Sequence, residues 1–546
     1  MSHSSKQLHQ REQRDSLKDL RAEVANLSKE LAASLAREKQ KDEEIAYLMK
    51  KLYGTSSEKR TRPVEGQVAF FNEVEAEAEK PLPAEEEKEI VQFERRKKSK
   101  TPRDEQLKGL QVKEKVIPLS DEDRICKECG AAMLPAGKKL IRRELVMIPA
   151  KVYIREIYAE TAYCPECKKE CAKADSDRKN NIVNAKVPEP LISGSMATES
   201  IVAHGMYQKY VNAVPLYRQE KDWQQMGIFL SRGRLASWIN VCSEEYFVPI
   251  YEYFHRLLLG REFGMADETR VQVLKEPNRK PETDSFMWLF RSGEDGLPSL
   301  ILYHYTETRA RYNAEAFLKG YKGYLMTDGY QGYNNLPGIK RTCCWAHVRR
   351  DFYDAIPAGK DKDYSLPAVQ GTMYCDKLFE VEKHCRQNNY SPEQRYEYRL
   401  KRAKPILEAF WVWLDGQLND SSIDPKSRLG KALSYANNRR AFLDVYLQDG
   451  RCSFSNNPSE NSIRPFVVGR KNWLFSDTPK GAKASAVVYT IVEMAKAHGL
   501  NVERYLTFLL KSRPNREMTD EELERLSPWS QEARDYCSHD HTEDEE

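Results

Sequence analysis

The chain has 546 residues, of which 40% are hydrophobic and 31% are charged, and its formal net charge is +4. This length exceeds what one hydrophobic core supports, so we expect about three to five domains. The apolar runs are too short to span a membrane and the N-terminus lacks a signal peptide's apolar segment, which predicts a cytoplasmic protein with no membrane partner. In the cytoplasm, twelve cysteines are not expected to form a disulfide framework.

The small net charge hides local runs of opposite sign. Residues 73–89 are mostly acidic, residues 95–103 are basic, and residues 540–546 are acidic again. A mean hydropathy of −0.73 indicates that much of the chain is solvated surface. Local basic segments are therefore better evidence for a nucleic-acid partner than the total charge is.

The N-terminal segment, residues 1–60, is predicted to be a coiled-coil oligomerisation helix. Its apolar residues step by alternating threes and fours, with polar residues in the middle of the seam. The two seam positions hold Leu17, Val24, Leu31, Glu38, Ile45 and Leu52, and Leu20, Leu27, Ser34, Lys41 and Leu48. We expect a homo-oligomer, most simply a dimer, although a lone amphipathic helix has the same pattern. Residues 61–110 are predicted to be a charged linker, because they contain too few apolar groups to fold.

Two CxxC pairs, Cys126 with Cys129 and Cys164 with Cys167, indicate a zinc-binding domain over residues 111–185. Four thiolates on two tight turns can close a tetrahedral site around one structural Zn²⁺. The segment between the pairs alternates in hydrophobicity, which predicts a hairpin that returns the second pair to the first. Redox pairs or buried cysteines are the alternatives, and Cys171 could replace one ligand.

Residues 186–260 are predicted to be a helical, helix-turn-helix-like DNA-binding region. A helix, a turn at Gly227 and a second helix capped by Ser231 would place Arg232 and Arg234 where they suit entry into the major groove. A plain helical hairpin fits this stretch equally well. The expected apolar face consists of Leu216, Trp223, Met226, Leu230, Leu235 and Trp238.

Residues 261–356 are predicted to be the first part of an α/β, ribonuclease-H-like core. Three strands, GMADETRVQVL, DSFMWLFRSG and SLILYHYTETR, precede a short helix and a fourth strand in YKGYLMTDGYQGYN. In that fold the first and fourth strands are neighbours, so Asp267 and Asp328 would project from adjacent strands. Glu268 alternates to the opposite face of its strand, and we expect it to be a surface or strand-end carboxylate.

From Arg341 to about Gly450 the chain is predicted to be helical, beginning with CCWAHVRRDFYDA. Residues 357–450 read as a helical insertion, residues 451–515 as the completion of the core with C-terminal helices, and residues 516–546 as an acidic tail. In SFSNNPSENSIRP, Asn457 is the expected N-cap and Glu460 falls three residues later. Glu460 could therefore be a capping-box residue and nothing more.

Eight segments in register resemble the transposases of the IS66 insertion-sequence family. They are LYGTSSEKR, CKECG, VPLYRQE, ADETRVQVL, MTDGYQGYN, CCWAHVRRDF, SNNPSENSIRP and GRKNWLFSDTPKGA, and the resemblance covers the chain from Leu52 to about Leu510. The resemblance implies a DDE transposase with a ribonuclease-H-like core, an N-terminal coil, a zinc-binding segment and a helical insertion. It places the catalytic triad on Asp267, Asp328 and Glu460. Relatives usually have Asp where this chain has Ser455, which is outside the triad.

The implied chemistry is cleavage at the ends of the element and transfer of a 3′-OH into target DNA. Three carboxylates can hold two Mg²⁺ or Mn²⁺ ions roughly 4 Å apart, and we expect Asp267 to bridge both ions. Asp328 and Glu460 would each bind one of them. Candidate DNA-contacting residues are His347, Arg349, Arg350, Arg464, Arg470, Lys471 and Trp473. Some of these have ordinary alternatives, namely core packing for Trp473 and an ion pair with Glu460 for Arg464.

The expected partners are the inverted-repeat ends, the target DNA and two small accessory proteins that such elements commonly encode. The DNA-bound protein would be associated with the nucleoid. Two other functions compete with transposition: a ribonuclease-H-like nuclease without strand transfer, and an inactive zinc-containing DNA-binding regulator. The intact acidic triad argues against the regulator.

Overall fold

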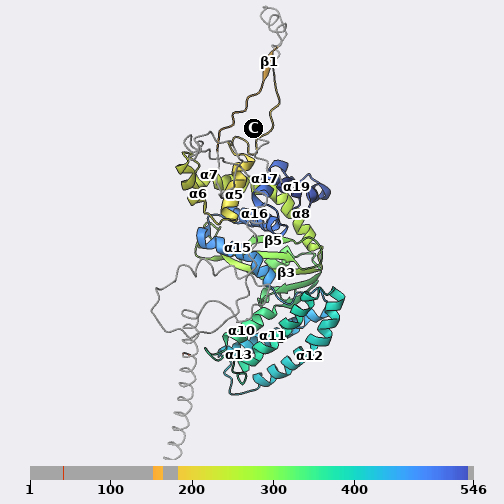
Figure 1. Cartoon of the computed structure of the whole chain (residues 1–546). Coiled ribbons are helices and arrows are strands. Elements are labelled where there is room, and N and C mark those ends of the chain that lie inside the picture. Colours follow the sequence, from red (N-terminus) through yellow and green to blue (C-terminus); the bar gives the residue numbers. More distant parts are fainter. Residues whose placement is uncertain (1–40, 42–151, 164–181, 539–546) are drawn as a thin grey trace, which may run out of the picture. The chain divides into compact units, whose positions relative to one another are not determined.

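The computed structural model describes Lys41, residues 152–163 and residues 182–538 (Figure 1). The chain separates into two units, one of residues 57–187 and one that includes residues 188–546, and each is described by itself. The predicted coiled coil (apart from Lys41, which is helical), the linker, the zinc-ligand cysteines and Cys171 lie outside the described residues.

In the smaller unit, β1 (Thr161–Tyr163) pairs antiparallel with β2 (Ile182–Asn184). The hairpin expected ahead of Cys164 extends into residues outside the described part. The described strand β1 pairs with β2, which follows both CxxC pairs in the sequence. The two strands therefore bracket the second pair, Cys164 and Cys167, in the sequence.

The larger unit is built around a mixed six-stranded sheet within the described residues, in the order β5-β4-β3-β6-β7, with β8 also paired to β3. The strands are β3 (Phe263–Val273), β4 (Asp284–Ser292), β5 (Ile301–Thr306), β6 (Gly323–Thr327), β7 (Ile339–Cys343) and β8 (Phe475–Ser476). The first three are antiparallel neighbours, whereas β6 and β8 pair parallel with β3. The expectation that the first and fourth strands of this sheet are neighbours is confirmed, since Met265 lies opposite Met326.

Helices cover the sheet and close its β5 edge. The buried helix α16 (Pro479–Ala497) lies along β5, where the Thr490 hydroxyl accepts from the Tyr303 backbone N–H at 2.8 Å and the Met494 sulfur from that of Ile301 at 3.2 Å. Side chains of α16 thus satisfy backbone groups that would otherwise form an open edge. The short helix α9 (Arg311–Phe317) precedes β6, as the sequence predicts.

Two strands were not predicted from the sequence, and the helix expected from Arg341 onwards is wrong in its first residues. Residues Ile339–Cys343 form β7, parallel to β6. The buried Arg341 in this strand donates to the Thr327 hydroxyl at 2.9 Å and to the Asp328 carbonyl at 2.6 Å. Two of the three buried residues of β7, Arg341 and Thr342, are polar, so β7 lacks the alternating apolar pattern of a strand. The two-residue β8 is too short to have one.

The segment ahead of the sheet is helical, as predicted. Its helices are α5 (Glu199–Tyr210), α6 (Leu216–Gln225), α7 (Arg232–Cys242) and α8 (Val248–Leu259), with a π-helical turn at Ser243–Phe247. The turn at Gly227 has φ +80°, and the Ser231 hydroxyl accepts from the Arg234 N–H at 3.3 Å, which confirms the cap. Met226 is wrong as an apolar-face residue: it follows the last residue of α6 and is 50% exposed.

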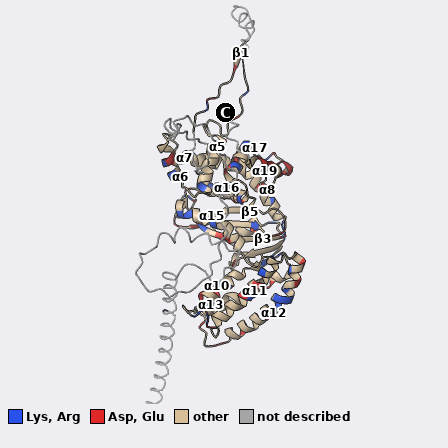
Figure 2. Ribbon diagram, viewed as in Figure 1, with Lys and Arg blue, Asp and Glu red and all other residues tan. Residues whose placement is uncertain are grey.

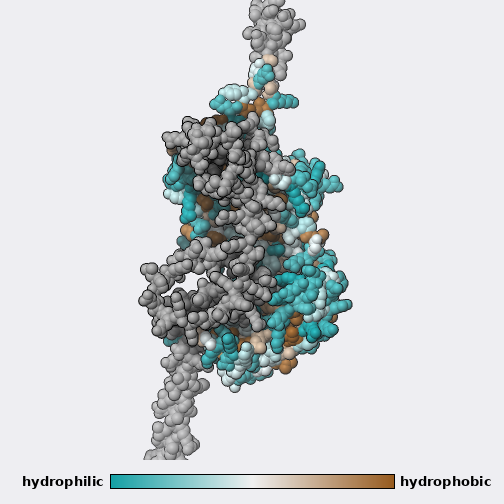
Figure 3. All heavy atoms as spheres, viewed as in Figure 1, coloured by the Kyte–Doolittle hydropathy of each residue, from teal (hydrophilic) through white to brown (hydrophobic). Residues whose placement is uncertain are grey.

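A helical unit with its own core covers the residues predicted as a helical insertion. It comprises α10 (Trp345–Asp354), α11 (Pro367–Gln387), α12 (Pro392–Leu418), α13 (Arg428–Asn437), α14 (Arg440–Leu443) and a 3-10 turn at Val445–Gln448. Trp345 and Phe352 of α10 are buried in the same cluster as Phe410 of α12, so the helical unit starts before residue 357. Lys and Arg gather along α12 in Figure 2, and the described surface facing the viewer in Figure 3 is mostly hydrophilic.

The chain ends in α15 (Asn457–Trp473), α16, α17 (Val502–Ser512), α18 (Asp520–Arg525) and α19 (Gln531–Ser538). Leu523 of α18 and Ala533 of α19 are buried in the main core, so much of the predicted acidic tail is folded. Of the helices in the described part of the chain, none is long and apolar enough to cross a membrane.

Candidate active site

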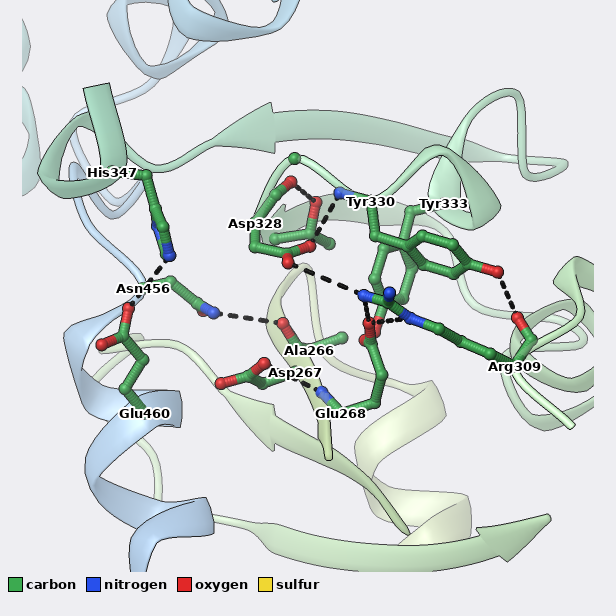
Figure 4. Close-up of polar contacts among 12 residues, drawn as sticks. Ala266, Asp267, Glu268, Arg309, Asp328, Tyr330, Tyr333, His347, Asn456 and Glu460 are labelled. Carbon is green, nitrogen blue, oxygen red and sulfur yellow. Dashed lines mark hydrogen bonds and ion pairs between the residues drawn. The ribbon is translucent and has the colours of Figure 1, made fainter. Parts of the chain in front are cut away.

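Three carboxylates from distant parts of the sequence surround one space (Figure 4). Asp267 lies on β3, two residues beyond the last residue paired with β6. Asp328 directly follows β6, and Glu460 lies in the first turn of α15. The parallel pairing of β3 with β6 brings the two aspartates to neighbouring strand positions, and α15 adds the third acid. The structure therefore brings together the three residues predicted as a triad.

Burial and neighbouring negative charge raise the pKa of Asp267 to about 8. The like charges are those of Glu268, Asp328 and Glu460, whereas the Glu268 backbone N–H, which donates to Asp267 Oδ1 at 2.9 Å, acts in the opposite direction. Such a carboxyl group gains its charge at neutral pH when a cation is bound beside it.

Glu460 does not cap its helix. The N-cap of α15 is Asn456, not the expected Asn457, and among the described residues its side chain makes no capping hydrogen bond. Glu460 Oε1 is buried and, within the part of the chain that the structure describes, accepts no hydrogen bond. Its neighbours on α10 are more distant, with His347 Nε2 at 3.7 Å from Oε1 and the Arg350 guanidinium Nη2 at 3.6 Å from Oε2. The capping interpretation of Glu460 is therefore wrong.

Asn456 is a site residue that the sequence analysis missed. It is fully buried, its side-chain amide donates to the Ala266 carbonyl at 3.2 Å, and its backbone N–H donates to the Cys344 sulfur at 3.1 Å. The first bond ties the start of α15 to β3 beside Asp267, and the second ties it to the N-cap of α10. The adjacent asparagines in SNNPSE were visible in the sequence, but their burial against β3 depends on contacts between residues 190 positions apart.

The expectation that Glu268 is a surface carboxylate is wrong. Its side chain points away from Asp267, as expected (Figure 4), but it is only 1% exposed. It accepts hydrogen bonds from the Arg309 guanidinium, with Nε at 2.7 Å, and from the Tyr333 hydroxyl. Burial and Asp328 raise the pKa of Glu268, whereas Tyr333 and Arg309 oppose that shift.

Arg309 is the second site residue that the sequence analysis missed. Its guanidinium lies 3.7 Å from the centre of the Tyr330 ring, the Tyr330 hydroxyl donates to the Arg309 carbonyl, and Nη2 is 3.9 Å from Asp328 Oδ2. Glu268 thus fixes a cation at the rim of the carboxylate cluster. No local pattern signals this contact, because an arginine in a polar turn is ordinary.

The other predicted site residues divide into those near the carboxylates and those held elsewhere. His347 and Arg350 of α10 are near Glu460, and burial lowers the pKa of His347. Arg470 donates to the Thr269 hydroxyl on β3 at 3.1 Å. By contrast, Arg349 donates to Asp376 of α11 at 2.6 Å.

The remaining predicted DNA contacts lie on α7 and α15. Trp473 packs against Phe466 and the main core, in accord with the packing alternative. Arg464 and Lys471 are exposed on α15. Arg232 and Arg234 are exposed at the start of α7, where the Arg232 guanidinium lies 5.5 Å from the centre of the Tyr217 ring.

The carboxylate cluster has the properties of a site for divalent cations. Its donor atoms are oxygens, which suit Mg²⁺ or Mn²⁺. A cation bound beside these acids would lower the raised pKa of Asp267. It would also give a partner to the buried Glu460 Oε1, which accepts no hydrogen bond from any described residue. This fold and site define a protein with a cluster of carboxylates, suited to divalent cations, at the centre of a mixed sheet.

Comparison with known proteins gives the family. The sequence model of the "Transposase IS66 family" matches residues 194–484, more than half of the chain, and the chain belongs to this family. It is therefore a DNA-processing enzyme by class. The model of the "zinc-finger binding domain of transposase IS66" matches residues 123–168, which contain all four cysteines predicted to bind zinc.

Similar curated proteins come from Sinorhizobium fredii. Uncharacterized protein y4jD is 26% identical over 431 residues, which are 76% of this chain and 80% of the relative. Uncharacterized protein y4qI is 28% identical over 366 residues, which are 64% of this chain and 66% of the relative. Neither name assigns an activity, so the mechanism is argued from the site.

Proposed function

We propose that this protein is a DDE transposase with a ribonuclease-H-like core, which cleaves DNA at the ends of its insertion sequence and transfers the 3′-OH into target DNA. The observation that carries the proposal is the meeting of Asp267, Asp328 and Glu460 from β3, the end of β6 and the start of α15. The strand order, with the first strand between the second and the fourth, supports the core assignment.

Each acid has a distinct place in the proposed reaction. The charges of Asp328 and Glu460 both raise the pKa of Asp267, as expected for a residue that would be shared by two Mg²⁺ or Mn²⁺ ions. Asp328 and Glu460 would then each bind one of the ions. When bound, these ions activate the attacking hydroxyl and stabilise the leaving oxygen of the phosphodiester.

The cations around the cluster would hold the DNA backbone. Arg309 lies beside Asp328, and Arg350 lies beside Glu460 and is 51% exposed. The two guanidiniums are near different acids, so a phosphate placed over the carboxylates could be contacted by both. Arg470, bonded to Thr269 on the Asp267 strand, would extend this contact along β3.

The remaining features are proposed from the sequence. One Zn²⁺ would be bound by Cys126, Cys129, Cys164 and Cys167, and the segment 1–60 would form the dimer. Arg232 and Arg234 would contribute to reading the inverted repeats. Two accessory proteins of the element would act with the transposase on nucleoid DNA.

The test is a strand-transfer assay with the full chain, the accessory proteins, Mn²⁺, a labelled duplex bearing the element's end and a supercoiled plasmid. We expect the end to be recovered joined to the plasmid, and we expect Asp328→Asn to abolish both cleavage and joining. Asp477→Asn is the matched control, because the Asp477 side chain pairs with Lys275 on the exposed surface. Nicking without joining would support the nuclease, and cleavage by Asp328→Asn at the parental rate would overturn the site.

A further inference from the structure

Next to the oxygen-only cluster lies a second group of potential ligands of different chemistry. The Cys344 sulfur, a His347 ring nitrogen and a Glu460 carboxylate oxygen all lie within 4.8 Å of one another. Cys344 is the N-cap of α10, His347 lies in the first turn of that helix, and Glu460 lies in the first turn of α15. Two helix starts therefore converge on one point.

Two of the three residues in this group, Glu460 and His347, each have one buried polar atom without a hydrogen-bond partner among the described residues. These atoms are Glu460 Oε1 and His347 Nδ1. The Cys344 side chain is buried, and its sulfur accepts the backbone N–H of Asn456 at 3.1 Å. Buried polar atoms in native proteins are almost always paired, so these two atoms of Glu460 and His347 suit a site that binds an ion or a water molecule.

The donor set selects the kind of ion. One sulfur, one imidazole nitrogen and one carboxylate oxygen are the ligands that Zn²⁺ takes in tetrahedral sites, and three protein ligands leave a fourth position for water. Mg²⁺, in contrast, takes oxygen ligands. We propose that Cys344, His347 and Glu460 form a site for Zn²⁺ that shares Glu460 with the carboxylate cluster. On binding, the Cys344 thiol releases its proton to solvent and the thiolate coordinates the metal.

Sharing Glu460 has a regulatory consequence, which rests on the proposed function. A carboxylate oriented towards a thiolate-bound Zn²⁺ no longer completes the all-oxygen cage with Asp267 and Asp328. Zn²⁺ at this site therefore inhibits Mg²⁺-dependent cleavage. The metal that the four-cysteine segment needs would then also switch off the chemistry when it is in excess.

The first experiment counts metal and needs no activity. Full-length protein is equilibrated with Zn²⁺ and analysed for bound zinc, and Co²⁺-loaded protein is scanned for sulfur-to-cobalt charge transfer. We expect Cys344→Ser and His347→Gln each to bind one zinc per chain fewer than the parent. The control is Cys343→Ser, the adjacent buried cysteine whose sulfur faces the Asp328 carbonyl at 3.7 Å, and it should bind the parental number. Equal zinc in the parent, folded Cys344→Ser and folded His347→Gln would overturn the proposal.

The second experiment measures inhibition. Added Zn²⁺ should reduce Mg²⁺-dependent end cleavage at least tenfold in the parent and in Cys343→Ser, and should leave Cys344→Ser far less affected. Equal inhibition of all three proteins would overturn the shared role of Glu460. If no protein cleaves in Mg²⁺ alone, the proposed function fails, but the zinc count still decides whether the site exists.

Discussion

The two sides of the carboxylate cluster differ in how their polar groups are satisfied. On one side Glu268, Arg309, Tyr330 and Tyr333 form a closed network that is already charge-balanced. On the other side Glu460 is left, among described residues, with an unpaired buried oxygen and cations no closer than 3.6 Å. Two acids adjacent in sequence thus differ in their surroundings: Glu268 pairs with Arg309, whereas Asp267 faces the side where a cation would offset the negative charge.

The largest expected effect is on DNA cleavage, and it comes from the side of the cluster that holds Glu460. Glu460→Gln should lower end cleavage by about 10²–10³-fold or more, because a metal-binding carboxylate is lost. The same change should alter the free energy of unfolding by no more than about 0.5 kcal/mol, since no hydrogen bond to Glu460 Oε1 from a described residue is broken. Cleavage rates and urea denaturation measure the two quantities, and loss of stability in step with activity would contradict the separation.

On the side of Glu268 we expect the larger effect on stability and not on cleavage. Glu268→Gln should reduce the free energy of unfolding by about 1–3 kcal/mol, because Arg309 and Tyr333 lose their buried charged acceptor. Asp284→Asn is the matched control, since Asp284 pairs with Arg270 on the exposed surface and should change stability by less than about 1 kcal/mol. An equal loss in the two variants, measured by urea denaturation, would show that the network adds nothing.

The pH dependence of the free energy of unfolding should reveal the titration of Asp267. Its pKa is about 8 in the metal-free protein, above the value of about 3.9 expected in the unfolded chain. The native state therefore binds the extra proton between these values, so stability falls as pH rises from about 4 to 8. Urea midpoints in Mg²⁺-free buffer should show this slope, and Asp267→Asn should reduce it. A slope that is unchanged in the variant would assign it to other groups.

The smallest effect concerns the two adjacent arginines of α10. Arg350→Ala should weaken DNA binding and reduce the salt dependence of the affinity by a slope of about 0.9, as expected when one phosphate contact is lost. Arg349→Ala should leave that slope unchanged, because Arg349 is engaged by Asp376. Binding isotherms at several salt concentrations provide the measurement, and equal slopes in both variants would remove Arg350 from the interface.

The sequence was sufficient for what local patterns encode. The order of strands along the chain placed Asp267 beside Asp328, and the turn and cap at Gly227 and Ser231 were read from residue type alone. It was sufficient as well to select Glu460, although not to decide between a metal ligand and a helix cap.

What the sequence could not provide were contacts between distant polar groups. Glu268 meets Arg309 and Tyr333 across 41 and 65 positions, and a local pattern shows a polar residue without showing what neutralises it. The same holds for β7, whose buried Arg341 is balanced by the Thr327 hydroxyl and by backbone carbonyl oxygen. Local alternation predicts burial only for apolar side chains.

The helical insertion leaves the sheet and returns to it at almost the same point. The Trp345 backbone N–H donates to the Phe454 carbonyl at 3.2 Å, and the two rings stack with their planes 6° apart. The chain between these residues also contacts the sheet elsewhere, because the Arg439 guanidinium donates to the Gly329 carbonyl, next to Asp328, at 2.8 Å. The insertion therefore enters and leaves at one point, Trp345 and Phe454, and supports the loop that carries Asp328 from a second.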